Sequence, residues 1–320
     1  MAEAGVVIVD KPGGMTSHDV VGRVRRLAGT RRVGHAGTLD PMATGVLVIG
    51  LEKATRLLGH LALTEKEYTA TIRLGLATVT DDAEGEALPP PADGGAAAGK
   101  ITQAQLRTAL AAFTGEIRQV PPRVSAIKVG GERAYRLTRS GVTPELAART
   151  VTISRLDLLD CKAAGDGLLD AEVSVTCSSG TYIRAIARDL GAALGTGGHL
   201  VKLRRTRVGP YRIEAARTLD ELAENFELTP LDQAAAAAFP TVSLPEDQAK
   251  LVSHGARLPT SVLDAAAPLG NSAAGLAANA TEGARSQGNG PVAAFGPDGG
   301  LLALLEVRAG EHRPLAVFVP

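Results

Sequence analysis

Apolar and polar positions follow two periods along the first 213 residues, and these periods predict most of the secondary structure. Residues 6–9 form a short apolar run typical of a buried strand, whereas residues 67–74 alternate as a half-buried strand does. Residues 102–113 and 181–194 place apolar side chains at helical spacing. Further strands are predicted at 46–50, 124–129, 151–159, 168–176 and 200–208, and further helices at 19–27, with Ser17 as the N-cap, and at 52–60.

The order of these elements predicts an α+β fold. Strands and helices are mixed without the regular alternation of parallel βαβ units. We therefore expect a mixed, mostly antiparallel sheet with flanking helices over residues 1–240. Three short strand patterns at 292–295, 301–307 and 315–319 predict a small β-rich C-terminal domain at 241–320. Residues 265–290, rich in Ala, Gly, Ser and Asn, are expected to form a disordered insert in it.

Composition places the chain among ordinary cytoplasmic globular proteins. Of its 320 residues 45% are hydrophobic and 21% charged, and no stretch has the length of a membrane span or the pattern of a signal peptide. Two distant cysteines, Cys161 and Cys177, suggest neither a disulfide framework nor a metal site. We expect a protein of the reducing cytoplasm.

The zero net charge hides an uneven distribution. Residues 1–217 hold 29 Lys and Arg against 22 Asp and Glu, whereas residues 218–320 hold 5 against 12. The first part, at +7, is a candidate for binding a polyanion, and the acidic tail is not.

The most informative local feature is a glycine-rich loop around a single carboxylate. Asp40 precedes Pro41 and follows Gly34 and Gly37, and an apolar run starts soon afterwards. Glycine allows close approach of a ligand to the backbone, and loops on rigid scaffolds often carry chemistry. Asp before Pro is also common in ordinary turns, so the loop by itself favours a turn over a catalytic site.

Three further segments change this interpretation. With the loop at 34–50, the segments at 10–17, 119–135 and 177–206 occur in one order along the chain. Together they resemble the bacterial tRNA pseudouridine-55 synthase family, over about residues 6 to 213. The resemblance implies a pseudouridine synthase fold and an isomerase that turns uridine 55 of the tRNA T loop into pseudouridine. It also implies that no metal and no cofactor takes part.

The resemblance assigns one catalytic residue and five that bind the substrate. Asp40 matches the aspartate that attacks C1′ of the ribose or removes the C2′ proton, and the sequence leaves both routes open. The substrate residues are His35, which helps displace the target base; Tyr68, which stacks on the flipped uracil; Tyr182 and Leu203, which line the pocket; and Arg184, which pairs with Asp40.

Basic residues in the same segments are predicted to bind RNA phosphates. They are Lys11, Arg31, Arg32, Lys128, Arg133, Lys202, Arg204 and Arg205. The segment that contains Lys11 is expected, in addition, to support the catalytic loop from below. The implied partner is the T arm of tRNA, bound by a monomer that needs no protein partner and no membrane.

Two departures from the family pattern affect the substrate groove and leave Asp40 untouched. Val124 stands where the family often has tyrosine, and Thr78-Val79-Thr80 where it often has Thr-Asp-Thr. Two other functions stay open: an RNA-binding module without catalysis, and a synthase guided by a separate RNA. The catalytic set argues against the first, and the acidic tail argues against the second.

Overall fold

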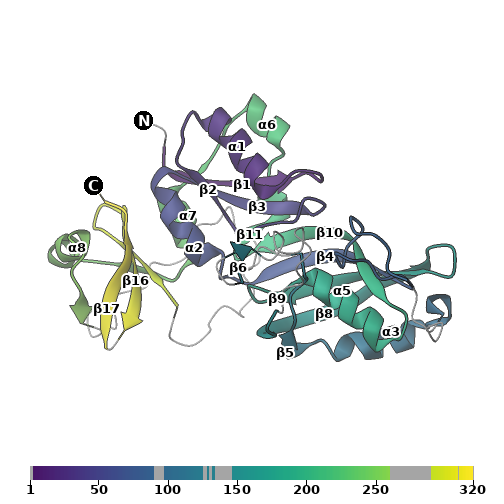
Figure 1. Cartoon of the computed structure of the whole chain (residues 1–320). Coiled ribbons are helices and arrows are strands. Elements are labelled where there is room, and N and C mark those ends of the chain that lie inside the picture. Colours follow the sequence, from purple (N-terminus) through teal and green to yellow (C-terminus); the bar gives the residue numbers. More distant parts are fainter. Residues whose placement is uncertain are drawn as a thin grey trace. The chain divides into compact units, whose positions relative to one another are not determined.

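The computed structural model describes residues 3–89, 97–124, 128–129, 132–133, 146–259, 290–308 and 310–319. The chain forms two compact units (Figure 1). The first unit contains residues 1–41, 45–64 and 207–320, and the second contains residues 42–44 and 65–206.

The first unit is built on strands β1 (Gly5–Lys11) and β3 (Thr44–Leu51), which pair antiparallel over seven residues. β3 also pairs with β2 (Val33–Ala36), and β1 pairs with β12 (Thr229–Pro230). Helix α1 (Ser17–Ala28) packs with α6 (Leu219–Glu224) over one face, where Val7, Val9, Val20 and Leu47 are buried together. The remaining elements of this region are η1 (Glu52–Leu57), α2 (Leu58–Leu61), β11 (Tyr211–Arg212), η3 (Ile213–Ala215) and α7 (Leu231–Ala238).

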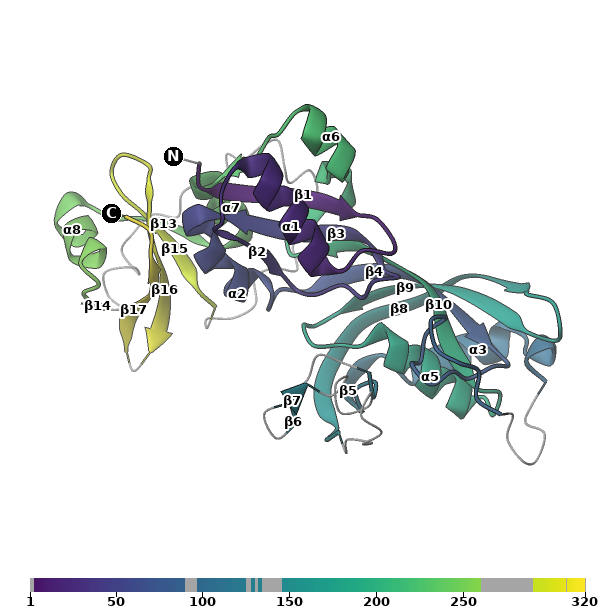
Figure 2. The same cartoon turned by 45° about the horizontal axis from the view of Figure 1, so that its top comes forward.

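A second sheet of the same unit begins at Thr241, with strand order β13-β15-β16-β17-β14. Its elements are β13 (Thr241–Ser243), α8 (Glu246–Ser253), β14 (Leu258–Pro259), β15 (Val292–Phe295), β16 (Leu301–Arg308) and β17 (Glu311–Val317). Helix α8 packs on β16 and β17, as Figure 2 shows. Phe295, Leu304 and Phe318 share one buried cluster with Val6 and Leu57, so this sheet and the first sheet have a common core.

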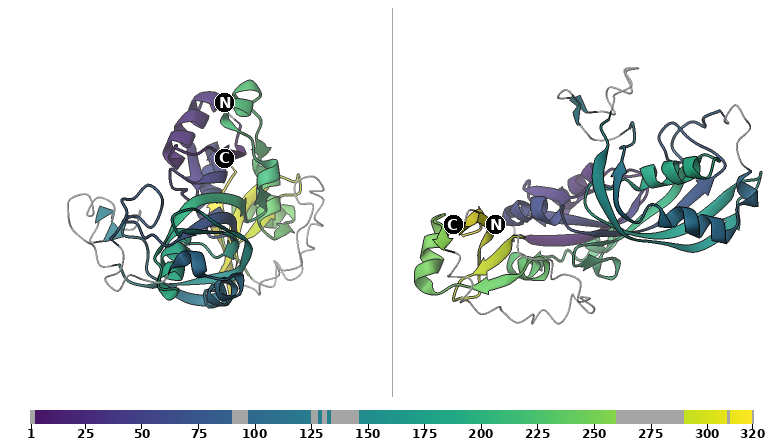
Figure 3. Two further views of the ribbon diagram at one scale, coloured as in Figure 1. Left: turned by 90° about the vertical axis from the view of Figure 1, so that its right-hand side faces the viewer. Right: turned by 90° about the horizontal axis from the view of Figure 1, so that it is seen from below.

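The second unit is a curved antiparallel sheet with strand order β10-β4-β9-β8-β5. Its strands are β4 (Lys66–Leu74), β5 (Gly115–Gln119), β8 (Arg149–Ala163), β9 (Leu169–Cys177) and β10 (Gly198–Val208), with a small hairpin of β6 (Lys128–Val129) and β7 (Glu132–Arg133). Helices α3 (Gln103–Ala111) and α5 (Ile183–Ala193) contact each other and lie on one face of this sheet, where Figure 3 shows them in the curve; η2 (Ala98–Lys100) precedes α3.

The structure confirms the predicted mixed, mostly antiparallel fold with flanking helices and a β-rich C-terminal part. Three local predictions were wrong. Thr16, not Ser17, caps α1, because its hydroxyl accepts from the amide of Asp19 in a capping box. Residues 52–60 form a 3₁₀ turn followed by one short α-turn, and residues 33–36 form a strand where only a loop was expected.

Two predictions concern the limits of the C-terminal domain and of the insert within it. The division at residue 240 stays a prediction. The insert predicted at 265–290 lies outside the described residues except for Gly290. Within the part of the chain that is described, no helix is long and apolar enough to cross a membrane.

A buried lysine in the second unit makes the stability depend on pH. Lys66, at the start of β4, is 6% exposed and lies opposite Cys177 in the sheet register. Burial, helped by the positive charge of Arg205, lowers the pKa of Lys66 to about 8. The unfolded chain, with a lysine pKa of about 10.4, therefore keeps this proton to higher pH than the folded chain does.

The amount by which Lys66 lowers the free energy of unfolding should therefore decrease as pH rises from 8 towards 10.5. The sign follows because in this window the unfolded state binds more protons than the folded state. The unfolding free energy of the wild type, measured by urea denaturation relative to Lys66→Met, should increase by about 1 kcal/mol between pH 7 and pH 9. A difference that stays constant or decreases would contradict the assigned pKa.

Candidate active site

The loop that contains Asp40 joins β2 to β3, and the residues on both sides of Asp40 are held by the first residue of α1 and by the turn that precedes it. The hydroxyl of Ser17 donates to the carbonyl of Leu39 at 3.2 Å and accepts from the amide of Leu39 at 2.9 Å. The carbonyl of Pro41 accepts from the amide of Gly14 at 2.8 Å. Asp40 is thereby presented, half-buried, from a backbone that is fixed immediately before and after it.

Lys11 is the centre of this support. Its side chain is fully buried, and its ammonium donates to the carbonyls of Pro12, Met15 and Pro41 at 2.9, 2.5 and 3.1 Å. The support that was expected from this segment for the Asp40 loop is therefore present. The prediction that Lys11 binds a phosphate was wrong, because a fully buried ammonium has no surface to offer to RNA.

His35 lies on β2 opposite Ile49 of β3, five residues before Asp40. Its ring packs edge to face against the exposed His18 of α1, with the ring centroids 5.6 Å apart and an interplanar angle of 79°. The strand therefore fixes the direction of His35 more firmly than the loop that we expected for it. The assignment of this residue to displacement of the target base stays a prediction.

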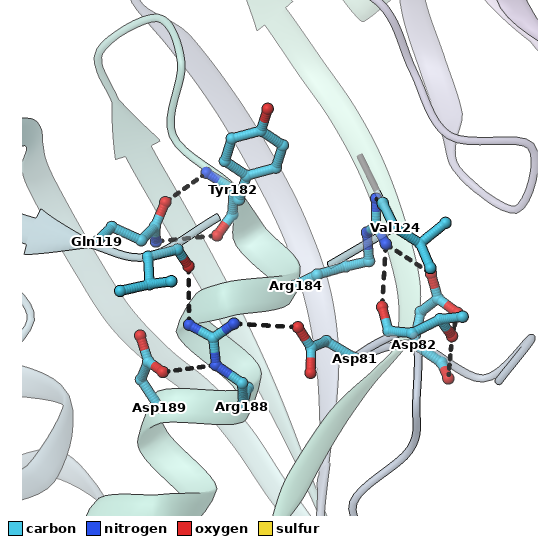
Figure 4. Close-up of polar contacts among 10 residues, drawn as sticks. Asp81, Asp82, Gln119, Val124, Tyr182, Arg184, Arg188 and Asp189 are labelled. Carbon is cyan, nitrogen blue, oxygen red and sulfur yellow. Dashed lines mark hydrogen bonds and ion pairs between the residues drawn. The ribbon is translucent and has the colours of Figure 1, made fainter. Parts of the chain in front are cut away.

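Four of the predicted substrate residues belong to the second unit. Tyr68 lies on β4 and Leu203 on the neighbouring strand β10, and they are 7% and 8% exposed. Tyr182 is the N-cap residue of α5, where the side-chain amide of Gln119 accepts from its amide at 2.8 Å and donates to its carbonyl at 3.0 Å. In Figure 4 the Tyr182 ring points away from this pair of bonds.

Arg184, in the first turn of α5, is the most strongly held side chain of this group. It is buried, and one guanidinium nitrogen, Nη1, donates to the carbonyl of Thr80 at 2.9 Å and lies 3.4 Å from the carboxylate of Asp82. The other, Nη2, donates to the carbonyl of Val124 at 3.1 Å (Figure 4). The departure at Val124 does not disturb this contact, because the acceptor is a backbone carbonyl. The predicted pair of Arg184 with Asp40 joins residues of the two units and stays a prediction.

The basic residues divide into exposed and buried groups. Arg31, Arg32 and Lys202 are exposed, and the partly exposed Arg204 donates to the hydroxyl of Thr44 at 3.3 Å. Arg205 is 1% exposed, so the prediction that it binds a phosphate was wrong for the same reason as for Lys11. Lys128 and Arg133 face each other in the register of the β6–β7 hairpin.

Sequence reasoning missed the residues that support the predicted ones. Ser17 was interpreted only as a helix cap, and Gln119, Asp81 and Arg188 were given no role. One signal was available: Arg184 and Arg188 are four residues apart on a predicted helix, and such residues share one face. The chain positions that meet this face, in the turn at 78–86 and at 119–124, follow from tertiary structure alone.

Known proteins match the chain along its whole length. The model of the N-terminal domain of TruB family pseudouridylate synthases matches residues 25–183, and the model of the tRNA pseudouridylate synthase B C-terminal domain matches residues 184–238. The tRNA pseudouridine synthase B of Arthrobacter sp. FB24 is 56% identical over 318 residues, which cover 99% of this chain and 97% of that protein. The protein of the same name from Thermobifida fusca is also 56% identical, with 98% of both chains covered.

Solved structures agree with these relatives. A chain in the crystal structure of a Cbf5-Nop10-Gar1 complex is 26% identical with a TM-score of 0.70, and the match covers 99% of this chain and 85% of that one. A chain of the archaeal box H/ACA sRNP Nop10-Cbf5 complex gives 25% and 0.69.

The fold and the matched sequence define a pseudouridylate synthase, an enzyme that isomerises uridine in RNA. Within that class the chain belongs to the TruB family.

Proposed function

We propose that this chain converts uridine 55 in the T loop of tRNA to pseudouridine, with Asp40 as the catalytic carboxylate. The observation that carries the proposal is the Asp40 loop, where Lys11 and Ser17 fix the backbone on both sides of the carboxylate. A catalytic group must be held in one orientation to react efficiently, and a plain surface turn needs no such support. Near-full-length relatives named tRNA pseudouridine synthase B support tRNA as the substrate.

The chemistry requires one carboxylate and no external reactant. The bond between N1 of uracil and C1′ breaks, and the same ring is reattached through C5 after a rotation. C5 then loses its proton to solvent and N1 takes one up, so that no atom is gained or lost overall. Asp40 can add to C1′ as the base leaves, or it can remove the C2′ proton to give a glycal. Deuterium at C2′ separates the two routes, because only the second breaks the C2′–H bond before the base is reattached.

The other site residues act on the base and its surroundings in this proposal. The target uridine is flipped out of the T loop, at a cost of a few kcal/mol, and Tyr68 offers its ring as a stacking surface. Tyr182 and Leu203 line the pocket, and His35 occupies the place that the base leaves. Arg184 pairs with Asp40 and orients it, while Asp82 and two carbonyls hold the guanidinium.

The competing functions are less well supported. A binding module without catalysis has no need of a doubly anchored aspartate. A synthase guided by a separate RNA would share the fold of the Cbf5 chains, but the chain's relatives at 56% identity are named for tRNA. We therefore also propose that the protein acts as a monomer in the cytoplasm, without a protein partner.

A tritium-release assay tests the proposal. Full-length protein is mixed with a T-arm tRNA transcript labelled at C5 of uracil, and the expected result is release of one tritium per transcript. A transcript with cytidine at position 55 is the control and should release none. Absence of release from the first transcript would refute the proposed function.

The exposed basic residues should make tRNA binding depend steeply on salt. Each phosphate contact releases counterions, so four contacts from Arg31, Arg32, Lys202 and Arg204 predict a slope of about −3 in log K against log salt concentration. Lys202→Gln should reduce the steepness by about one. Lys162→Gln, which removes a charge paired with Glu172 at 2.9 Å on β8, should leave the slope unchanged. Equal slopes for wild type and Lys202→Gln would exclude Lys202 from the RNA contact.

A further inference from the structure

Two arginines on successive turns of α5 bind the same two segments of the second unit. Arg184 contacts the turn at 78–86 through Thr80 and Asp82, and it contacts the segment at 120–124 through the carbonyl of Val124. Arg188 repeats this arrangement one helical turn later. It lies 3.2 Å from the carboxylate of Asp81 and donates to the carbonyl of Val120 at 2.8 Å (Figure 4).

The two arginines therefore bind the two ends of the five-residue segment at 120–124. Arg188 binds the carbonyl of Val120, and Arg184 binds the carbonyl of Val124. Each arginine also pairs with one of two consecutive aspartates of the turn, Arg188 with Asp81 and Arg184 with Asp82. Arg188 is also held in place by Asp189, whose carboxylate lies 2.8 Å from its Nε. Three acceptors thus fix the plane of the Arg188 guanidinium.

The backbone at Asp81 shows that this geometry is specifically maintained. Asp81 has a φ of +61°, a left-handed conformation that an L-residue other than glycine seldom adopts. Its carbonyl accepts from the amide of Leu200 at 3.0 Å, which ties the turn to β10. Such strain persists only where the surroundings over-determine it, and the ion pair with Arg188 is one of these constraints.

The inner pair, Arg184 with Asp82, is more deeply buried than the outer pair, Arg188 with Asp81. The side chains of Arg184 and Asp82 are 6% and 5% exposed, whereas those of Arg188 and Asp81 are 29% and 12% exposed. Burial raises the pKa of the Asp81 carboxyl, against the opposing effect of Arg188 and Arg184. The outer pair lies at the edge of the cluster, where it can hold the turn and the segment without being part of the inner contacts.

We propose that Arg188, with Asp81, is a positioning residue for catalysis: it locks the turn at 78–86 and the segment at 120–124 so that Arg184 keeps one orientation. Without Arg188, the carbonyl of Val120 loses its guanidinium donor, and the turn at 78–86 loses the ion pair at Asp81. The acceptors of Arg184 at Thr80, Asp82 and Val124 then shift. This inference rests on the proposed function, in which Arg184 orients Asp40.

The test compares Arg188→Gln with a matched variant, Arg73→Gln. Arg73 forms a bidentate pair with Asp170 at 2.7 and 2.8 Å between β4 and β9 of the same unit, and the two side chains are 30% and 11% exposed, much like those of Arg188 and Asp81. Single-turnover pseudouridine formation, tRNA affinity and urea unfolding are measured for wild type and both variants.

Arg188→Gln should lower the single-turnover rate about fivefold to tenfold, because a small misplacement of an orienting group is costly, while the Kd for tRNA stays within about twofold. Arg73→Gln should lower stability at least as much and leave the rate unchanged. Arg188→Lys, which retains a charge for Asp81 but cannot hold three acceptors in a plane, should show a smaller rate loss.

Asp81→Asn provides a second path to the same result if Arg188→Gln does not fold. Added to Arg188→Gln, it should increase the rate loss little, since Arg188→Gln has already removed the ion pair, whereas added to Arg188→Lys it should bring the loss up to that of Arg188→Gln. A wild-type rate in Arg188→Gln, or an equal rate loss in Arg73→Gln, would overturn the inference. Lack of product from wild type itself would instead refute the proposed function.

Discussion

Asp40→Asn should abolish pseudouridine formation and leave tRNA binding intact. The asparagine amide has nearly the shape of the carboxylate, so the loop held by Lys11 and Ser17 should keep its structure. It can neither attack C1′ nor accept the C2′ proton, and loss of such a group costs at least about 10³-fold in rate. Single-turnover tritium release measures the rate, and filter binding measures the affinity.

Asp19→Asn is the matched control for this experiment. Asp19 is the nearby carboxylate of the α1 capping box, and it accepts from the amide of Thr16 at 2.9 Å. Asparagine can still accept this bond, so the variant should turn over within about twofold of wild type. Normal turnover by Asp40→Asn would show that the catalytic residue has been assigned to the wrong position.

Lys11→Met should destabilise the protein and slow the reaction without weakening tRNA binding. Methionine matches the length of lysine but leaves the buried carbonyls of Pro12, Met15 and Pro41 without their charged donor. Each such group costs about 1–3 kcal/mol, and with partial relaxation we expect a loss of about 3 kcal/mol in unfolding free energy. The rate should decrease by about tenfold or more, because Pro41 adjoins Asp40.

The unchanged tRNA affinity is the decisive measurement for Lys11. A phosphate contact would make the variant bind more weakly and with a shallower salt dependence. Lys250→Met on α8 is the control, because Lys250 pairs with Glu246 on the surface at side-chain exposures of 71% and 77%. It should change neither stability nor rate. A Lys11→Met protein with wild-type stability would contradict the structural role.

The sequence predicted the elements whose apolar pattern is strong and local. The runs at 6–9 and 46–50 became β1 and β3, and the amphipathic pattern at 181–194 became α5. The strand at 33–36 was missed because Val-Gly-His-Ala has no alternation, and it is a strand because β3 pairs with it. Pairing between distant segments therefore decided what local pattern could not.

The residues of the candidate site divide in the same way, into those marked by a local motif and those whose contacts depend on tertiary structure. Asp40 and Arg184 could be proposed from the sequence because each occupies a recognisable motif. Lys11 and Arg205 were assigned to RNA on charge alone, and charge does not reveal that a side chain is 0% or 1% exposed. The contacts that hold Arg184 come from residues about 60 and 100 positions away, at Val124 and Thr80, and no periodicity connects them.

The shared core of the first unit limits how this protein can be taken apart. Phe295, Leu304 and Phe318 fill the same apolar cluster as Val6 and Leu57, so the last 80 residues share a buried core with the rest of the first unit. Cutting the chain after Phe239 would leave part of that cluster facing water and would invite aggregation. For the same reason, exchanging the tail for that of another protein would also require changes in the residues of the first unit that pack against it. Any contribution of the tail to RNA binding is thus open to study by exchanging its exposed charges, with the chain kept whole.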